Sequence, residues 1–253
     1  MSSEAKAEAL EAYMMRQLNQ APAPGTGAKF LTAAEVEAQI ETRSYRRGVG
    51  NLFLTTQPSA KVKKLPKMPE KPTLLDFFKN RFTATSNHVL QSAALAKKRG
   101  VSEEVILACL LHDTVLDMIK PDHGWWGAQM YEPYVPEKTS FAIRYHQSLR
   151  FYEDKEAGYV YPDMYRNMFG EDYVPLPHIQ AAYKYVRNHK WYMEPRLVTV
   201  NDLHAFDANA VVSIDPFIDI IGRHFKQPKE GLGNDNSPVA HMWRTLATPD
   251  SPL

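Results

Sequence analysis

Four histidines form two pairs with nearly equal spacing, and this pattern carries more chemical information than any other in the chain. Gly100 lies midway between His88 and His112, and the PYVP turn at residues 133–136 lies midway between His123 and His146. A helical hairpin with arms of equal length brings its two ends together. The spacing therefore predicts two pairs of adjacent imidazoles, each able to bind a metal ion.

A carboxylate accompanies the first pair, because Asp113 directly follows His112 at the end of the apolar run CLLHD. Burying this dyad without partners would cost roughly a few kcal/mol, whereas a metal ion would satisfy both groups. Imidazole and carboxylate together suit Zn, Fe, Mn, Co or Ni better than Mg or Ca. The lack of thiolate ligands argues against a closed structural zinc site.

The composition is that of a globular protein with one sizeable domain or one domain and an appendage. The chain has 253 residues, 44% of them hydrophobic, and a net charge of +1, so nothing indicates nucleic-acid binding. The single cysteine, Cys109, fits a reducing compartment. We see neither a signal peptide nor a window of ~18 apolar residues, and we expect a cytoplasmic protein without membrane contact.

An N-terminal arm precedes the residues that could do chemistry. Residues 3–19 have the pattern of an amphipathic helix, and Thr32 and Glu35 resemble a capping box that opens a second helix. Residues 56–72 are rich in proline and lysine, which predicts an extended linker. We therefore expect an arm and linker over 1–70 and a metal-binding catalytic domain over 71–253. The arm could also mediate a homodimer.

The elements after the linker are predicted to be helical almost throughout. Helices are expected from Thr73, over 86–98, after an N-cap at Ser102, over 124–132 and 137–153, from His178, over 196–212 and over 215–225. The aromatic and proline-rich segment 159–177 is expected to be an irregular loop. We find no alternating strand pattern, so the predicted fold class is all-α, a helical bundle with an N-terminal helical arm.

Residues 74–225 resemble the HD-domain superfamily of all-α metalloenzymes. The resemblance is carried by NHVLQSAALA, CLLHD, DHGWWGA, RYHQSLR and NDLHAFDANA. Two histidines between the His-Asp dyad and the last aspartate are typical of the dinuclear branches. These branches include cyclic-nucleotide phosphodiesterases and mixed-valent diiron oxygenases, such as myo-inositol oxygenase and the phosphonate-cleaving oxygenases. The closing segment AFDANAVVSIDPFIDIIGRHF is most similar to that of the oxygenases.

The resemblance implies a ligand set for two ions. One ion would take His88, His112, Asp113 and Asp207, and the other would take Asp113, His123 and His146. Asp207 is preferred as the last ligand because it follows Phe206, while Asp202, in VNDLH, resembles the last aspartate of some HD phosphohydrolases. The implied cofactor is a pair of mixed-valent iron ions, and Zn, Mn, Co or Ni remain open.

Arg150 is a candidate for binding the substrate. It follows His146 by four residues, so the two side chains share a helix face, and a guanidinium suits a carboxylate, phosphate or phosphonate. In the family, a basic residue at this place holds the anionic group of the substrate.

The sequence leaves three functions open. The first is a diiron oxygenase that uses dioxygen on a small anionic, hydroxylated or amino-substituted molecule, with Arg150 and Asp113 in catalytic roles. The second is a metal-dependent HD hydrolase of the phosphohydrolase or phosphodiesterase kind. The third is a catalytically degenerate HD binding protein.

Overall fold

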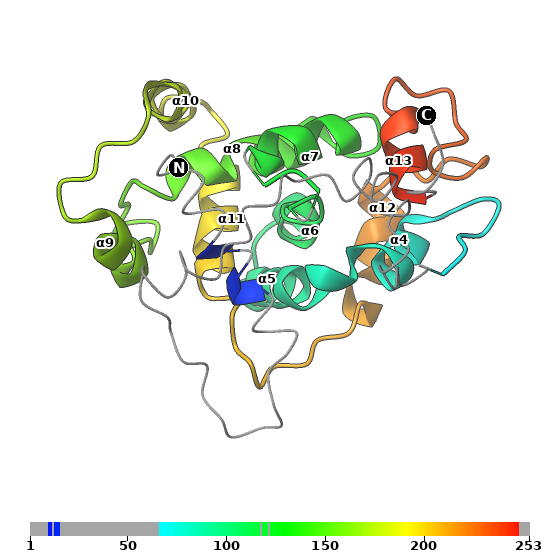
Figure 1. Cartoon of the computed structure of the whole chain (residues 1–253), viewed down its shortest axis with the longest axis horizontal. Helices are drawn as coiled ribbons and strands as arrows, with labels where there is room; N and C mark the ends of the chain where they lie inside the picture. Colours follow the sequence, from blue (N-terminus) through cyan, green and yellow to red (C-terminus); the bar gives the residue numbers. More distant parts are fainter. Residues whose placement is uncertain (1–9, 12, 16–65, 117, 121, 248–253) are drawn as a thin grey trace, which may run out of the picture.

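The computed structural model describes residues 10–11, 13–15, 66–116, 118–120 and 122–247, and this part of the chain is all-α (Figure 1). The helices are α4 (Leu74–Asn80), η1 (Phe82–Ala84), α5 (Ser86–Lys98), α6 (Glu103–Leu111), α7 (His123–Tyr131), α8 (Glu137–Leu149), α9 (Asp163–Phe169), α10 (Pro177–Arg187), α11 (Met193–Leu203), η2 (Asp215–Phe217), α12 (Ile218–His224) and α13 (Ala240–Ala247). The described residues contain no β-strand, and an isolated bridge pairs Asp154 with Tyr159.

Helix α6 is the central element of the bundle. Ser102 caps it, since its hydroxyl accepts a hydrogen bond from the Val105 amide, and all seven residues after Glu104 are buried. A helix that is apolar on every side must be surrounded by other elements. Figure 1 shows α6 end-on with α5, α8, α11 and α12 around it, and these four helices all contact it. Its C-terminal end, which carries His112, therefore lies inside the bundle.

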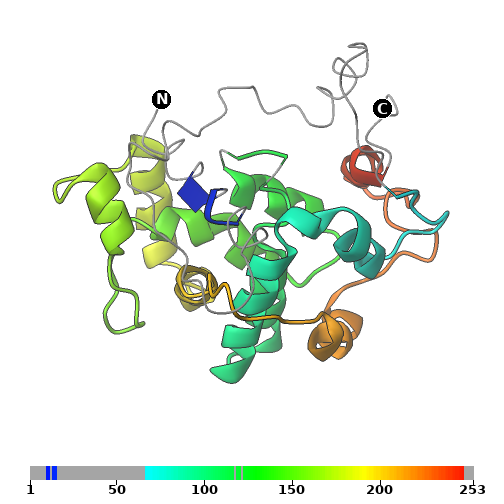
Figure 2. The same ribbon diagram turned by 60° about the horizontal axis from the view of Figure 1, so that its bottom comes forward.

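Two helical hairpins meet around the end of α6. The turn between α5 and α6 contains Gly100 with φ of +69°, a left-handed conformation that glycine adopts without strain. The second hairpin joins α7 to α8, and α11 packs against α5, α6 and α8 (Figure 2). This arrangement brings the N-terminal ends of α5 and α7 close to the C-terminal ends of α6 and α8.

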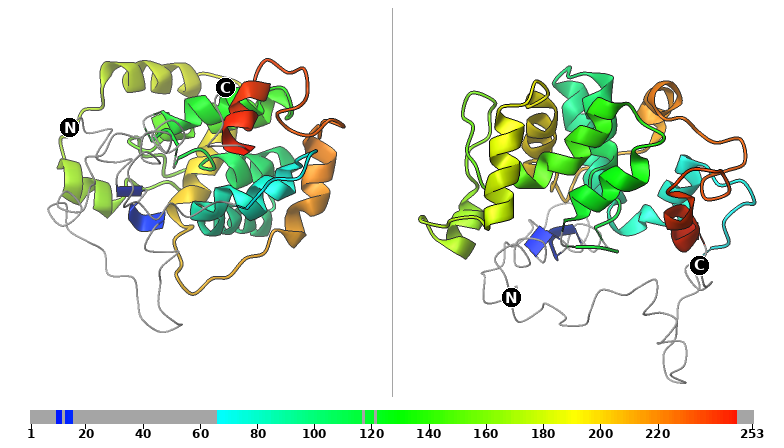
Figure 3. Two further views of the ribbon diagram at one scale, coloured as in Figure 1. Left: turned by 45° about the vertical axis from the view of Figure 1, so that its right-hand side comes forward. Right: turned by 90° about the horizontal axis from the view of Figure 1, so that it is seen from above.

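A second packed region lies at the other side of the bundle, where α4, α12 and α13 gather (Figure 3). Trp243 of α13 is fully buried and its ring makes an edge contact with Phe77 of α4 at a centroid distance of 4.7 Å. Arg81 ties the end of α13 in place by donating hydrogen bonds to the carbonyl oxygens of Leu246 and Ala247. This aromatic region is continuous with the main hydrophobic core of the bundle.

The all-α fold class is confirmed, and two expectations about single elements are wrong. Residues 159–177 are not wholly irregular, because they contain α9, which packs through Tyr165 and Met164. The helix expected over 196–212 ends at Leu203, and residues 205–207 follow without helix. Helix α13 has no counterpart among the predicted elements.

Most of the predicted arm lies outside the described residues. Within the expected helix 3–19, residues 10, 11 and 13–15 are described and helical. The helix expected from Thr32 and most of the linker lie outside, so the division into an arm and a catalytic domain stays a prediction. No helix in the described ranges is long and apolar enough to cross a membrane.

Candidate metal centre

The backbone fixes the orientation of all four imidazoles. The Nδ1 atoms of His112, His123 and His146 donate to the carbonyl oxygens of the residues three positions earlier, at 2.8, 3.1 and 2.7 Å. His88 Nδ1 donates to the Ala205 carbonyl oxygen at 3.1 Å. Because a carbonyl oxygen can only accept, each Nδ1 carries a hydrogen. Each Nε2 is then the ring atom that can bind a metal ion, as in metal-binding histidines.

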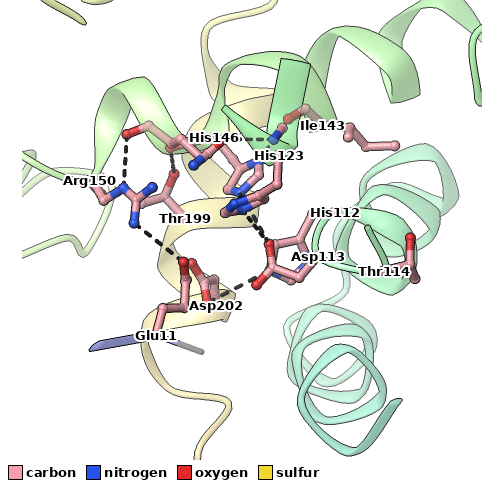
Figure 4. A network of polar contacts seen from close by, with 12 residues as sticks. Glu11, His112, Asp113, Thr114, His123, Ile143, His146, Arg150, Thr199 and Asp202 are labelled. Atoms are coloured by element: carbon pink, nitrogen blue, oxygen red, sulfur yellow. Dashed lines mark hydrogen bonds and ion pairs between the residues drawn. The ribbon is translucent and has the colours of Figure 1, made fainter. Parts of the chain in front are cut away.

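The four Nε2 atoms converge in two pairs, as the hairpin spacing predicted, and Figure 4 shows His112, His123 and His146 around Asp113. His88 Nε2 lies 3.3 Å from His112 Nε2, and His123 Nε2 lies 3.3 Å from His146 Nε2. All four side chains are buried. With the Nδ1 hydrogens already donated, the Nε2 lone pairs face each other unless a proton or a metal ion lies between them.

Asp113 lies between the two pairs and points one carboxylate oxygen at each. Its Oδ2 is 3.3 Å from Nε2 of His88 and of His112, and its Oδ1 is 2.8 Å from His123 Nε2 and 3.4 Å from His146 Nε2. The side chain is fully buried, and neither oxygen accepts a hydrogen bond within the described part of the chain. This is the placement that a carboxylate bridging two cations requires.

The last carboxylate of the first group is Asp202, and the preference for Asp207 is not supported by the geometry. Asp202 Oδ1 lies 3.0 Å from His88 Nε2 and 3.7 Å from His112 Nε2. Asp207 is exposed, and its carboxylate accepts a hydrogen bond from the Asn209 amide. The reason is the end of α11 at Leu203: Asp202 is held on the helix face that packs on α5, whereas Asp207 lies in the segment beyond it.

Burial and the two carboxylates act on the imidazoles in opposite directions. Burial disfavours protonation of His88, but the adjacent carboxylates of Asp113 and Asp202 outweigh it and raise its pKa to about 9. The pKa of His112 is likewise raised well above its ordinary value despite burial, through Asp113. Burial lowers the pKa of His146. Burial also opposes ionisation of Asp113 and Asp202, yet the neighbouring imidazoles hold both carboxyl pKa values below the ordinary range. The cluster thus has a strong affinity for positive charge.

The residues present fit two metal ions. His88, His112, Asp113 and Asp202 form one group, and Asp113, His123 and His146 form another, with the ligand atoms of each group within 4.8 Å of one another. Asp113 belongs to both. The buried carboxylate oxygens of Asp113 and Asp202 that lack hydrogen-bond donors in the described part of the chain are what a cation would satisfy. The second group has fewer protein ligands, which leaves coordination positions for other molecules.

Arg150 lies beside this cluster, on the side of Asp202 (Figure 4). It follows the last residue of α8, is buried, and lines a small pocket together with Asp202 and Thr199. The rest of the pocket wall is largely apolar or aromatic: Leu10, Met14, Tyr159, Met164, Tyr165, Leu203 and Phe206. The structure thus places a buried cation next to the first metal-ligand group.

Three residues that support the site were missed from the sequence. Gln91 exchanges two hydrogen bonds with the backbone of Asp207, both 2.9 Å, and so holds the segment after α11 against α5. Thr199 donates to the His146 carbonyl oxygen at 3.0 Å. The Gly124 amide donates to Gln147 Oε1 at 2.6 Å. Gly124, directly after a candidate ligand, offered a signal of close helix packing, whereas Gln91 and Thr199 offered none.

Comparisons with protein-family models, with curated proteins and with solved structures found no match. The arguments for function therefore come from the residues and the geometry of this chain.

Proposed function

We propose that this protein is a dinuclear metalloenzyme of the HD type, a diiron oxygenase that acts on a small anionic substrate carrying a hydroxyl or amino group. The observation that supports it is the bridging position of Asp113 between two imidazole pairs, with unequal numbers of protein ligands on the two sides. Unequal ligation gives one ion a structural role and leaves the other open to substrate and dioxygen.

The iron pair, when bound, would supply dioxygen activation and a Lewis acid for the substrate oxygen. The chain's own groups have separate tasks. Asp113 and the four imidazoles would hold the ions, and the Nδ1 hydrogen bonds keep the rings oriented. Arg150 binds the anionic group of the substrate, at a pocket wall shared with Asp202.

The character of the pocket favours oxygenase chemistry. Its wall is mostly apolar and aromatic, and Val115 and Leu116, which follow the His-Asp dyad, are buried. A water-poor site protects reactive intermediates from side reactions. A hydrolase instead needs a proton donor for its leaving group. The dyad of HD enzymes usually continues with x-Gly-Lys, which supplies a candidate donor, whereas this chain has Val115 and Leu116 at the last two of these positions.

Metal analysis of protein expressed with iron and purified without oxygen tests the proposal. We expect about two iron ions per chain and, after partial oxidation, the electron paramagnetic resonance signal of a mixed-valent pair. His112→Ala is expected to lose metal, whereas His178→Ala, at an exposed position on α10, should keep both ions. Two tightly bound zinc ions with no iron would contradict the oxygenase assignment.

A metal-dependent hydrolase is the second candidate, and one observation favours it. The carboxylate at the cluster is Asp202 in VNDLH, the sequence context that resembles the last aspartate of some HD phosphohydrolases. Hydrolysis of bis(p-nitrophenyl) phosphate by protein loaded with Mn, Co, Ni or Zn would support this candidate. Absence of stoichiometric metal under all loading conditions would instead favour the third, a binding protein. A cytoplasmic location and a homodimer formed through the arm also stay predictions.

A further inference from the structure

Glu11 contacts the arginine that we assign to the substrate anion. Its Oε2 lies 3.3 Å from Arg150 Nη1, and the two residues are only 7% and 4% exposed (Figure 4). Both line the pocket that Asp202 also lines. A carboxylate from the start of the chain therefore lies where an anionic substrate would meet Arg150.

Apolar contacts on two sides hold the residues around Glu11 at the wall of the pocket. We call residues 10, 11 and 13–15 the N-terminal segment. On one side, Leu10 and Tyr13 pack against Tyr165 of α9. On the other side, Met15 packs with Leu116 and Phe206.

The contact of Met15 with Leu116 and Phe206 lies beside the metal-ligand groups. Leu116 lies three residues after Asp113, and the ring of Phe206 stacks on His88 at a centroid distance of 4.4 Å. The N-terminal segment thus extends from α9 to the wall of the metal centre, and Leu10, Glu11 and Met14 form part of the wall of the pocket between them.

Two negative groups compete for one guanidinium at this position. The pocket already holds the carboxylates of Glu11 and Asp202, so a substrate anion on Arg150 would meet strong repulsion while Glu11 remained there. Removing Glu11 takes one buried carboxylate away from Arg150, which is costly, whereas exchange for another anion keeps that charge contact.

We propose that the N-terminal segment is an internal lid in which Glu11 occupies the anion position of Arg150 and is replaced by the anionic group of the substrate. This inference rests on the proposed function for the role of Arg150. The apolar contacts of the N-terminal segment are compatible with a replaceable Glu11–Arg150 pair, since Met14 and Met15 have flexible side chains that pack and repack at little cost.

Binding of inorganic phosphate to the metal-loaded protein, measured by calorimetry, tests the competition. Glu11→Gln removes the competing charge but keeps the shape, so phosphate should bind about tenfold more tightly than to the wild type. Arg150→Ala should weaken binding by at least about tenfold. Glu171→Gln is the matched control: it breaks the exposed ion pair with Arg166 and should leave phosphate affinity unchanged.

Hydrogen–deuterium exchange of the peptide that contains residues 10–15 follows the lid itself. Phosphate should raise amide exchange there in the wild type, and Arg150→Ala should show raised exchange with or without phosphate. Slower exchange on binding phosphate, weaker binding by Glu11→Gln, or no phosphate binding by either wild type or Glu11→Gln would each overturn the lid. The metal content of the same samples reports separately on the proposed function, and the comparison of Glu11→Gln with wild type is repeated on metal-free protein, in which the Glu11–Arg150 pair is present.

Discussion

At the scale of single residues, the two candidate aspartates can be separated by one pair of substitutions. Asp202→Asn replaces a charged ligand near His88 with a neutral amide, so the affinity of the first metal position should fall by at least about tenfold. Asp207→Asn changes an exposed carboxylate whose partner is a backbone amide, and should keep both ions. Metal titration of the two variants is the measurement, and equal losses would show that the ligand assignment is wrong.

The raised pKa of His88 predicts how metal binding depends on pH. Below about 9, His88 in the metal-free protein holds a proton, which an incoming ion must displace. Metal affinity should therefore rise with pH between 6.5 and about 9, by about tenfold per unit for each proton released, and then level off. Calorimetric titrations in buffers of different ionisation enthalpy count the protons. Affinity that is flat over this range would contradict the prediction.

The raised pKa of His88 also affects the stability of the metal-free protein. A pKa raised from 6.5 to about 9 stabilises the folded state, fully so below 6.5, and this stabilisation is lost as the pH rises through 9. The metal-free protein should therefore unfold at lower urea concentration at pH 9.5 than at pH 6.5, while metal-loaded protein should not show this His88 contribution.

A ligand could be predicted where its evidence lies in the neighbouring sequence, and could not where it depends on the folded structure. The four histidines and Asp113 were predictable, because equal hairpin arms and a buried dyad leave a mark in the sequence. Asp202 was not preferred, because choosing between it and Asp207 requires the position where α11 ends. That end is at Leu203, where no glycine or proline marks it, and the following segment is held by Gln91 from a distant helix.

At the scale of elements, Gly124 allows α7 to approach α8 closely enough for the second pair of imidazoles to form. A Cβ at this position would lie 2.7 Å from the Ile143 carbonyl oxygen and 2.9 Å from Gln147 Oε1. Backbone cannot give way cheaply, so Gly124→Ala should push the helices apart and cost about 1–3 kcal/mol of stability. We expect this variant to lose the ion held by His123 and His146 and to keep the other.

Gly222→Ala in α12 is the control for Gly124→Ala. A Cβ there meets nothing within 4 Å, so alanine should raise stability by about 0.4–1 kcal/mol and leave the metal content unchanged. Urea denaturation and metal analysis measure both effects. Two ions retained in Gly124→Ala would mean that the close approach of the helices is not needed for the second position.

The two helical hairpins could be predicted from the sequence, whereas helix α9 could not. Gly100, the Ser102 cap and the PYVP turn place the helix boundaries directly. Helix α9 was hidden in an aromatic and proline-rich segment, because its stability comes from packing of Tyr165 with Leu10 and Tyr13, far away in the chain. Propensity carries no information on such contacts.

At the scale of the whole molecule, the aromatic region around Trp243 belongs to the main hydrophobic core, and Tyr131 connects it to Thr114, the residue after Asp113. Trp243 is fully buried against Phe77, Tyr131 and Tyr134, and its ring contacts in the described part of the chain include no candidate ligand. Trp243→Ala should therefore cost about 3–5 kcal/mol of unfolding free energy, as a large cavity does. The metal content per folded chain should stay at two. Metal loss in protein that is still folded would show that this core also positions the ligands.

The contact of Glu11 with Arg150 joins residues that are 139 positions apart in the chain. The sequence indicated a helix at 3–19 and an anion-binding arginine, but it could not show that Glu11 and Arg150 meet. Only the folded chain reveals that contact.

The most direct test of the account is anomalous diffraction from crystals of metal-loaded protein, recorded at the absorption edge of the bound metal. We predict two peaks about 3.5–4 Å apart. One peak should lie between Nε2 of His88 and His112 with Asp202 beside it, the other between Nε2 of His123 and His146, and Asp113 should touch both. A cluster without anomalous density, or a metal ion bound only at other residues, would contradict the account.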